Sequence, residues 1–128
     1  MKRSGRLRPR SKGKNWRKVL DDLCREVVFA RDKATCQWCG KRDGQMHWAH
    51  IRSRRYLSTR WHLDNSVVLC AGCHLRFHHE PMLAAVWFQG KFARRDATLN
   101  LYSRKLMTGK LDRKVIRLFL EQELARYE

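Results

Sequence analysis

Four cysteines stand in two pairs whose spacing is that of a metal site. Cys36 and Cys39 form the first C-x-x-C pair, and Cys70 and Cys73 form the second. Two residues between thiolates on a turn let both sulfurs reach one ion, and four thiolates complete a tetrahedral zinc site with Zn–S distances of about 2.3 Å. Four cysteines leave no open ligand position, so the pattern predicts a structural zinc ion. The alternative is two pairs of reduced thiols without a ligand.

The histidines are also clustered in the sequence. All six lie between residues 47 and 79, and they are His47, His50, His62, His74, His78 and His79. His74 and His78 are four residues apart in a segment expected to be helical, which puts both imidazoles on one helix face. That spacing is typical of metal ligands, and it makes this segment the candidate site for chemistry.

The chain carries a formal net charge of +17 over 128 residues. Such an excess predicts a polyanionic partner reached by electrostatic steering, with nucleic acid favoured over an anionic membrane. The chain has no apolar run of about 18 residues, and its first segment lacks the apolar middle of a secretory signal. We therefore expect a soluble intracellular protein that binds nucleic acid.

Four arginines follow His50 closely in the sequence, and they are Arg52, Arg54, Arg55 and Arg60. A guanidinium group grips phosphate with paired donors, so these residues are predicted to contact the nucleic-acid backbone. Such contacts give affinity without reading sequence. The alternative interpretation is a solvated loop.

The elements that must position these residues follow from hydrophobic periodicity and from helix caps. Residues 1–15 are basic and almost without apolar side chains, which predicts a disordered arm, and residues 16–128 are predicted to form a single domain. Asn15 can cap the first helix, Pro81 and Gly90 can bound a later one, and Asp96 and Asp112 can cap the last two. The expected elements are helices over 16–31, 73–80, 81–88, 96–109 and from 113 onward, with strands over 45–51 and 66–70.

Several motifs together resemble those of a known family. Cys36-x2-Cys39, His50-Ile51, Asn65 and Leu69-Cys70-x2-Cys73-His74 resemble the zinc-framed HNH endonucleases over roughly residues 31–81. The segments Arg31-Asp32, His47-Trp-Ala-His50-Ile and Arg60-Trp-His-Leu-Asp-Asn65 are similar to HNH proteins of phages, including the NinG-type recombination nucleases.

The resemblance implies an α+β fold, the ββα-metal finger, with flanking N- and C-terminal helices and a helical extension over 82–128. It implies hydrolysis of DNA phosphodiester bonds, in duplex or branched DNA, in the cytoplasm of a bacterial host. By the same resemblance, His50 is the general base, Asn65 braces the loop and orients His50, and His74 binds a catalytic Mg²⁺ or Mn²⁺ together with His78.

One position departs from that family. Many members carry Asp or His immediately before the base as a metal ligand, whereas this chain has Ala49. His47 would share the strand face of Ala49 at a distance of about 6.6 Å along the strand. The replacement ligand is therefore His47, His78 or water, and Asp64 is a further candidate. The same departure favours the alternative function, a zinc-dependent nucleic-acid-binding module that has lost catalysis.

Overall fold

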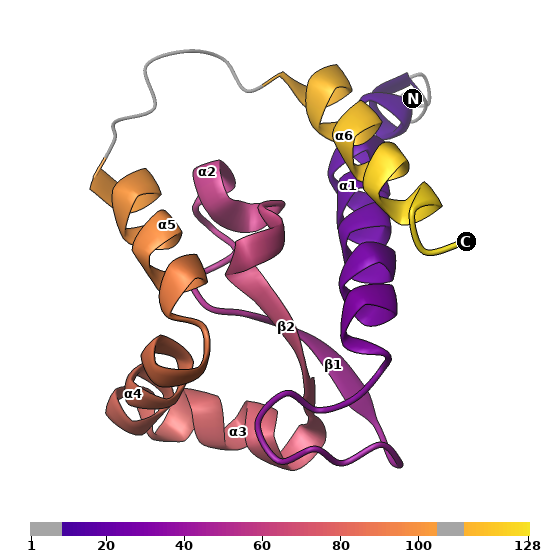
Figure 1. Ribbon diagram of the computed structural model, residues 1–128. Coiled ribbons are helices and arrows are strands. Elements are labelled where there is room, and N and C mark those ends of the chain that lie inside the picture. The colour runs from indigo at the N-terminus through magenta and orange to yellow at the C-terminus, as the bar shows by residue number, and fades with distance from the viewer. Residues whose placement is uncertain (1–8, 105–111) are drawn as a thin grey trace, which may run out of the picture.

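The computed structural model describes residues 9–104 and 112–128, apart from the side chains of residues 9–14, 103 and 104. It has a mixed α+β architecture, as predicted, in which helices surround a sheet of two strands (Figure 1). The elements are α1 (Pro9–Asp32), β1 (Met46–His50), α2 (Leu57–Arg60), the 3-10 helix η2 (Leu63–Asn65), β2 (Ser66–Cys70), α3 (Ala71–His79), α4 (Pro81–Lys91), α5 (Ala93–Arg104) and α6 (Arg113–Ala125).

The two strands are antiparallel, and helices cover both faces of the sheet. Trp48 pairs with Val68 and Ala49 with Val67 in the register. Successive side chains of a strand point to opposite faces, so these two pairs serve different cores. Helices α1 and α6 lie on one side of the strands, while α3, α4 and α5 lie on the other (Figure 1).

Each face has its own buried cluster. The cluster under α1 and α6 contains Leu20, Cys24, Val28, Trp61, Val68 and Leu120. The cluster under α3, α4 and α5 contains Ala49, Val67, Leu69, Phe88 and Leu99, together with three of the paired cysteines. Full burial of one such large apolar side chain stabilises a fold by about 1.5–3 kcal/mol. Burial on both faces explains why every residue of β2 is buried.

The C-terminal end of α1 is fastened to β2 by an Arg-Asp pair. Arg31 donates from Nη1 to the Leu63 carbonyl and from Nη2 to the Ser66 carbonyl, each at 2.7 Å. Asp32 accepts from the Val68 amide at 3.0 Å and from Arg31 Nε at 2.8 Å. These bonds hold the start of β2, and with it the loop before it, in one place.

The first helix begins earlier than predicted. It starts at Pro9, so residues 9–15 belong to α1 and not to the predicted disordered arm, while residues 1–8 lie outside the described residues. Proline is well suited to the first turn of a helix. Lys and Arg are good helix formers, so a helix anchored further along by core packing propagates into this segment.

The boundaries of α4 and α5 also differ from the prediction. Gly90 does not end α4, which continues to Lys91, and Asp96 lies inside the first turn of α5 instead of capping it. The Asp96 amide donates to the Phe92 carbonyl at 2.9 Å, so Phe92 is the residue that precedes α5 and accepts its first hydrogen bond. Phe92 packs against the second core, and this contact sets the boundary more strongly than the local cap signals. The predicted end at residue 109 lies outside the described residues.

The C-terminal helix begins where its cap predicts. Asp112 accepts the Val115 amide at 3.1 Å, and α6 follows directly. Within residues 9–104 and 112–128, none of the helices combines the length and the apolar character needed to cross a membrane.

Candidate metal centre and histidine cluster

The four paired cysteines converge in space. The sulfur atoms of Cys36, Cys39, Cys70 and Cys73 all lie within 4.8 Å of one another. Four thiol ligands at such separations could hold a metal ion such as zinc. The prediction that the two pairs meet is confirmed, and the 30 intervening residues form a closed loop that contains both strands.

Two turns aim the thiols inward. At the first, the Gly40 amide donates to the Cys36 carbonyl at 2.9 Å, and Gly40 has a φ of 81°, which glycine adopts without strain. The Cys39 amide points at the Cys36 sulfur at 3.5 Å. At the second, the Cys73 amide points at the Cys70 sulfur at 3.4 Å, where β2 gives way to α3. At the first turn, the backbone N–H groups favour the thiolate form of Cys36 that a metal requires.

The thiols of the cluster are electrostatically unequal. Burial acts to raise the pKa of Cys36, but backbone and thiol hydrogen bonds outweigh it and lower that pKa. Burial and the neighbouring thiols raise the pKa of Cys73. Several thiolates this close repel one another, so all four ionise together only beside a cation. The chemistry of the cluster therefore fits a divalent ion.

Three of the predicted histidines meet next to the sheet. His47 on β1 lies with its Nδ1 at 2.7 Å from Nδ1 of His74 on α3, and His74 Nε2 lies 3.2 Å from His78 Nε2. The two neighbours contact opposite nitrogens of His74, so the imidazoles form a chain. Burial, followed by the charges of His78 and His47, lowers the pKa of His74. For all three to bind one ion, the His74 ring must turn so that a single nitrogen faces both neighbours.

The residue before His50 lies in the core. Ala49 is fully buried and packs with Val67, Phe88 and Leu99. The position before His50 is thus covered by α4 and α5. His47 shares the strand face of Ala49, and its ring contacts that of His74.

His50 is directed away from this cluster. It ends β1, and its ring packs edge-on against Trp48 with 4.2 Å between ring centroids, on the face covered by α1. Its Nε2 lies 3.1 Å from the Arg60 carbonyl. A carbonyl only accepts, so Nε2 carries the proton and Nδ1 keeps its lone pair. Burial, the largest influence, lowers the pKa of His50 to about 4, which keeps the ring neutral near neutral pH.

Asn65 braces the loop between the strands, as predicted. Its side chain accepts from the Arg52 amide at 2.8 Å and donates to the Arg52 carbonyl at 3.2 Å. Its own carbonyl accepts from the Ile51 amide at 2.8 Å. The side chain is fully buried. These three bonds fix the backbone immediately after His50.

An aspartate that the sequence analysis does not single out holds the other end of this loop. Asp21 on α1 accepts from Arg60 Nε at 3.0 Å, from Arg60 Nη2 at 2.7 Å and from Trp61 Nε1 at 2.8 Å. Burial acts to raise the pKa of Asp21, but the bonds from Arg60 and Trp61 outweigh it and lower the pKa. Asp21 thus positions the Arg60 carbonyl that accepts the hydrogen bond from His50. A sequence signal for this role was available. Asp21 adjoins the apolar stripe of a helix, and an acid in such a place needs a cationic partner when it is buried.

This geometry corrects the prediction for Arg60. Its guanidinium is only 14% exposed and is committed to Asp21, so it is not available to grip phosphate. Arg54 also reaches Asp21, at 3.2 Å, but is 57% exposed. Arg52 donates to Asn100 at 2.6 Å, and Arg55 is exposed. Three of the four predicted arginines therefore keep some access to a partner.

The remaining candidates lie outside the histidine cluster. Asp64 pairs with Arg94 at 3.3 Å and with Arg95 at 3.9 Å. His62 accepts the Asp64 amide at 3.0 Å, and burial lowers its pKa. His79 is exposed at the end of α3. None of these contacts joins the cluster of His47, His74 and His78.

Replacing Asp21 with asparagine should weaken the hydrogen bond between His50 Nε2 and the Arg60 carbonyl, and it should also destabilise the fold. Breaking a largely buried ion pair with several hydrogen bonds is expected to lower the free energy of unfolding by about 2 kcal/mol. Imidazole ¹⁵N shifts of His50 should change from one tautomer to a mixture. The matched control is Asp22→Asn, since Asp22 pairs with Lys18 on the exposed surface and its loss should cost under about 0.5 kcal/mol. A single unchanged His50 tautomer in the Asp21 variant would contradict the positioning role.

The lowered pKa of His50 predicts an acid-sensitive fold. The unfolded chain protonates this residue below about pH 6.5, whereas the folded chain resists protonation down to about pH 4. The contribution is fully present above the unfolded pKa and is lost as pH falls. Between about pH 7 and pH 5 wild type should lose about 2 kcal/mol more than His50→Gln in urea unfolding. Equal losses in the two proteins would show that burial of His50 is not linked to stability.

Comparison of the chain with protein-family models, curated proteins and solved structures finds no match.

Proposed function

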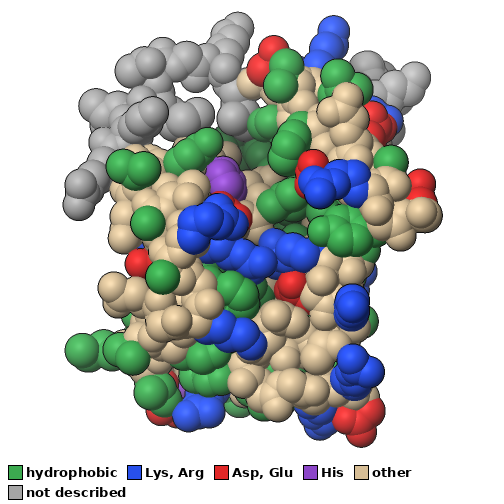
Figure 2. All heavy atoms as spheres, viewed as in Figure 1, with side chains coloured by type: hydrophobic (Ala, Val, Ile, Leu, Met, Phe, Trp, Pro, Cys, Tyr) green, Lys and Arg blue, Asp and Glu red, His purple; other side chains and the backbone are tan. Residues whose placement is uncertain are grey.

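We propose that this chain is a metal-dependent HNH endonuclease that hydrolyses DNA phosphodiester bonds. The observation that carries the proposal is the meeting of His47 on β1 with His74 and His78 on α3, in a unit of two antiparallel strands followed by a helix. In this proposal that unit is a ββα-metal finger. The high positive charge supports a nucleic-acid substrate, and Lys and Arg side chains spread over the face seen in Figure 2.

Each residue of the proposed site has a role that follows from its surroundings. His50 takes the proton of the attacking water at Nδ1, since its Nε2 is engaged by the Arg60 carbonyl. Asn65 holds the backbone beside His50 in place. His74, with His47 and His78, would bind a divalent ion, Mg²⁺ or Mn²⁺. Such an ion stabilises negative charge on the phosphate and on the leaving oxygen.

The four cysteines have a separate role in this proposal. Cys36, Cys39, Cys70 and Cys73 would bind one structural zinc ion, because their four converging thiols would fill every ligand position of a tetrahedral site. The ion would join the turn before β1 to the junction of β2 and α3. It would thereby set the separation of the strand and the helix that carry the histidines.

A second function is favoured by a specific observation. His50 lies on the opposite strand face from His47 and His74, and Ala49 is buried where a metal ligand stands in many HNH proteins. A zinc-dependent nucleic-acid-binding module that has lost catalysis would show this arrangement. In that case the histidines would contribute to folding and the basic surface to binding.

Plasmid nicking separates the two functions. Zinc-loaded protein is incubated with supercoiled plasmid and Mg²⁺ or Mn²⁺, and a parallel reaction contains no added ion. The nuclease proposal predicts conversion to open-circular DNA only with a divalent ion. If the protein shifts the plasmid in a gel and yet never nicks it with any divalent ion, the catalytic proposal is wrong and the binding module stands.

A further inference from the structure

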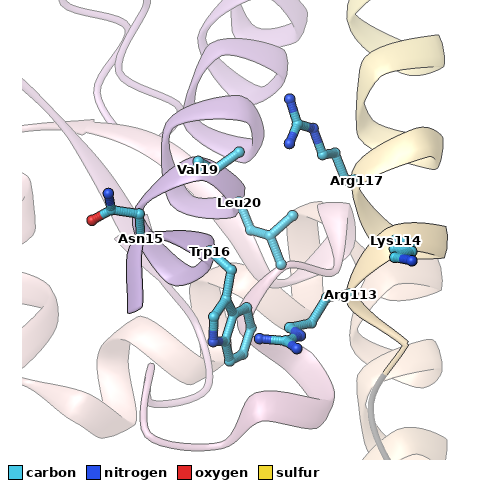
Figure 3. Close-up of a pocket in the computed structure, with 7 residues that line it drawn as sticks. All are labelled: Asn15, Trp16, Val19, Leu20, Arg113, Lys114 and Arg117. Atoms are coloured by element: carbon cyan, nitrogen blue, oxygen red, sulfur yellow. The ribbon is translucent and has the colours of Figure 1, made fainter. Parts of the chain in front are cut away.

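A pocket of about 300 Å³ lies in the seam between α1 and α6, apart from the histidine cluster. Its floor is apolar, formed by Trp16, Val19 and Leu20 of α1. Its rim carries positive charge, because α6 contributes Arg113, Lys114 and Arg117. Figure 3 shows the three cationic residues of α6 across the gap from the α1 side chains, with the Arg113 guanidinium beside the Trp16 indole. No acidic side chain lines the pocket.

The Trp16 ring holds two guanidinium groups in place. Arg113 lies over it at 4.8 Å and Arg17 at 5.2 Å from the ring centroid. Trp16 is itself packed on Trp61, with 5.4 Å between the ring centroids. An indole covered in this way is not free to stack on a base. It can instead orient the guanidinium donors before a partner arrives, which reduces the entropy lost on binding.

The charges of the seam are poorly neutralised within the protein. Among the described residues, no carboxylate lies within 4.0 Å of Arg17, Arg113 or Lys114 in an ion pair, while Arg117 pairs with Glu121 at 3.2 Å on the exposed surface. Asp112, which precedes these residues, is engaged as the cap of α6 through the Val115 amide. Like charges gathered without counterions repel one another, and an anion removes that cost.

We propose that this seam is a second nucleic-acid contact, which seats backbone phosphate between Arg113 and Lys114. The inference rests on the proposed action on DNA and adds a binding surface outside the ββα unit. Guanidinium and ammonium groups with no base-stacking surface suit phosphate and carry no sequence preference. In the sequence, Arg10, Lys12 and Lys14 directly precede the residues of the pocket, so the run of basic residues continues there in the sequence.

The test compares two double variants of the full-length, zinc-loaded protein that each remove two exposed cations. One is Arg113→Gln with Lys114→Gln, and the control is Lys41→Gln with Arg42→Gln. Lys41 and Arg42 lie in the segment between the first cysteine pair and β1, and Figure 1 shows this segment at the opposite end of the molecule from the start of α6. Binding to a labelled DNA duplex is measured by fluorescence anisotropy over a series of salt concentrations.

Each phosphate contact contributes about 0.9 to the slope of log affinity against log salt. We expect the seam variant to lose about 1.8 in slope and roughly tenfold in affinity at low salt, while the control changes little. Equal changes in the two variants would overturn the proposal, since they would reflect net charge alone. An unchanged slope in the seam variant would also overturn it. A third contradicting result would be a seam variant that binds DNA normally but no longer binds vesicles of phosphatidylserine. That result would show that the seam contacts a membrane.

This outcome is independent of whether the protein cuts DNA. Nicking depends on the histidine cluster, so His74→Ala should keep the wild-type salt slope. If wild type binds DNA but does not nick it, the proposed nuclease function fails and the slope comparison still decides the role of the seam.

Discussion

Replacing Cys36 with serine is expected to abolish cooperative folding. The four sulfurs join two parts of the chain that are 30 residues apart, and one of the two buried clusters includes Cys36, Cys70 and Cys73. Structural zinc contributes about 10–16 kcal/mol of apparent binding free energy in small domains, which is as large as the total stability of a typical domain. Loss of one ligand should therefore leave no cooperative thermal transition in circular dichroism, and elemental analysis should find less than one zinc ion per chain.

The control for this prediction is the fifth cysteine. Cys24 is buried in the other cluster, and its sulfur contacts the Trp61 carbonyl at 3.8 Å, away from the four converging thiols. Cys24→Ala should cost about 1 kcal/mol through lost packing and should retain one zinc ion per chain. A Cys36→Ser protein that melts at the wild-type temperature would contradict the proposal that a structural zinc ion bound by these cysteines stabilises the fold.

Replacing His50 with alanine should slow nicking by about 10²–10⁴-fold without weakening DNA binding. That is the usual contribution of a positioned general base. With the pKa of His50 near 4, the ring is neutral over the physiological range, so this group should cause no loss of the wild-type rate between about pH 6 and pH 8. The measurement is the initial rate of plasmid nicking in Mn²⁺, with DNA affinity measured in parallel.

The control here is His79→Ala, because His79 is exposed on α3 and lies outside the histidine chain. It should nick at close to the wild-type rate. Full activity in His50→Ala would show that another group, or the His47–His74–His78 chain itself, activates the water. Such a result would fit the direction of His50 toward Trp48.

The spacing of residues close in sequence was sufficient to predict several features of the fold and the cysteine cluster. The C-x-x-C pairs, the strand over 66–70 and the Asp112 cap depend on residues close in sequence, and the structure has all three. The hydrogen bonds of Asn65 to the backbone at Arg52 also agree with the expected role. In each case few alternative arrangements satisfy the same local groups.

The geometry around His50 could not be predicted in the same way. Burial of Ala49 depends on α4 and α5, whose packing no motif encodes. The pairing of Asp21 with Arg60 joins residues 39 positions apart, so the sequence left Arg60 as a candidate phosphate ligand. The direction of His50 follows from strand alternation combined with the choice of face that α1 covers. All three features depend on tertiary packing in the two buried clusters on either side of the sheet.

The most direct test of the central claim is the nicking rate of His74→Ala beside that of wild type in the same Mn²⁺ series. His74 is the only one of the three clustered histidines that contacts both others, so its loss should disrupt the divalent-ion site. We predict nicking slower by at least about 10³-fold, with DNA affinity and zinc content unchanged. Equal nicking by the two proteins would contradict the account, because the histidine cluster would then have no part in the reaction.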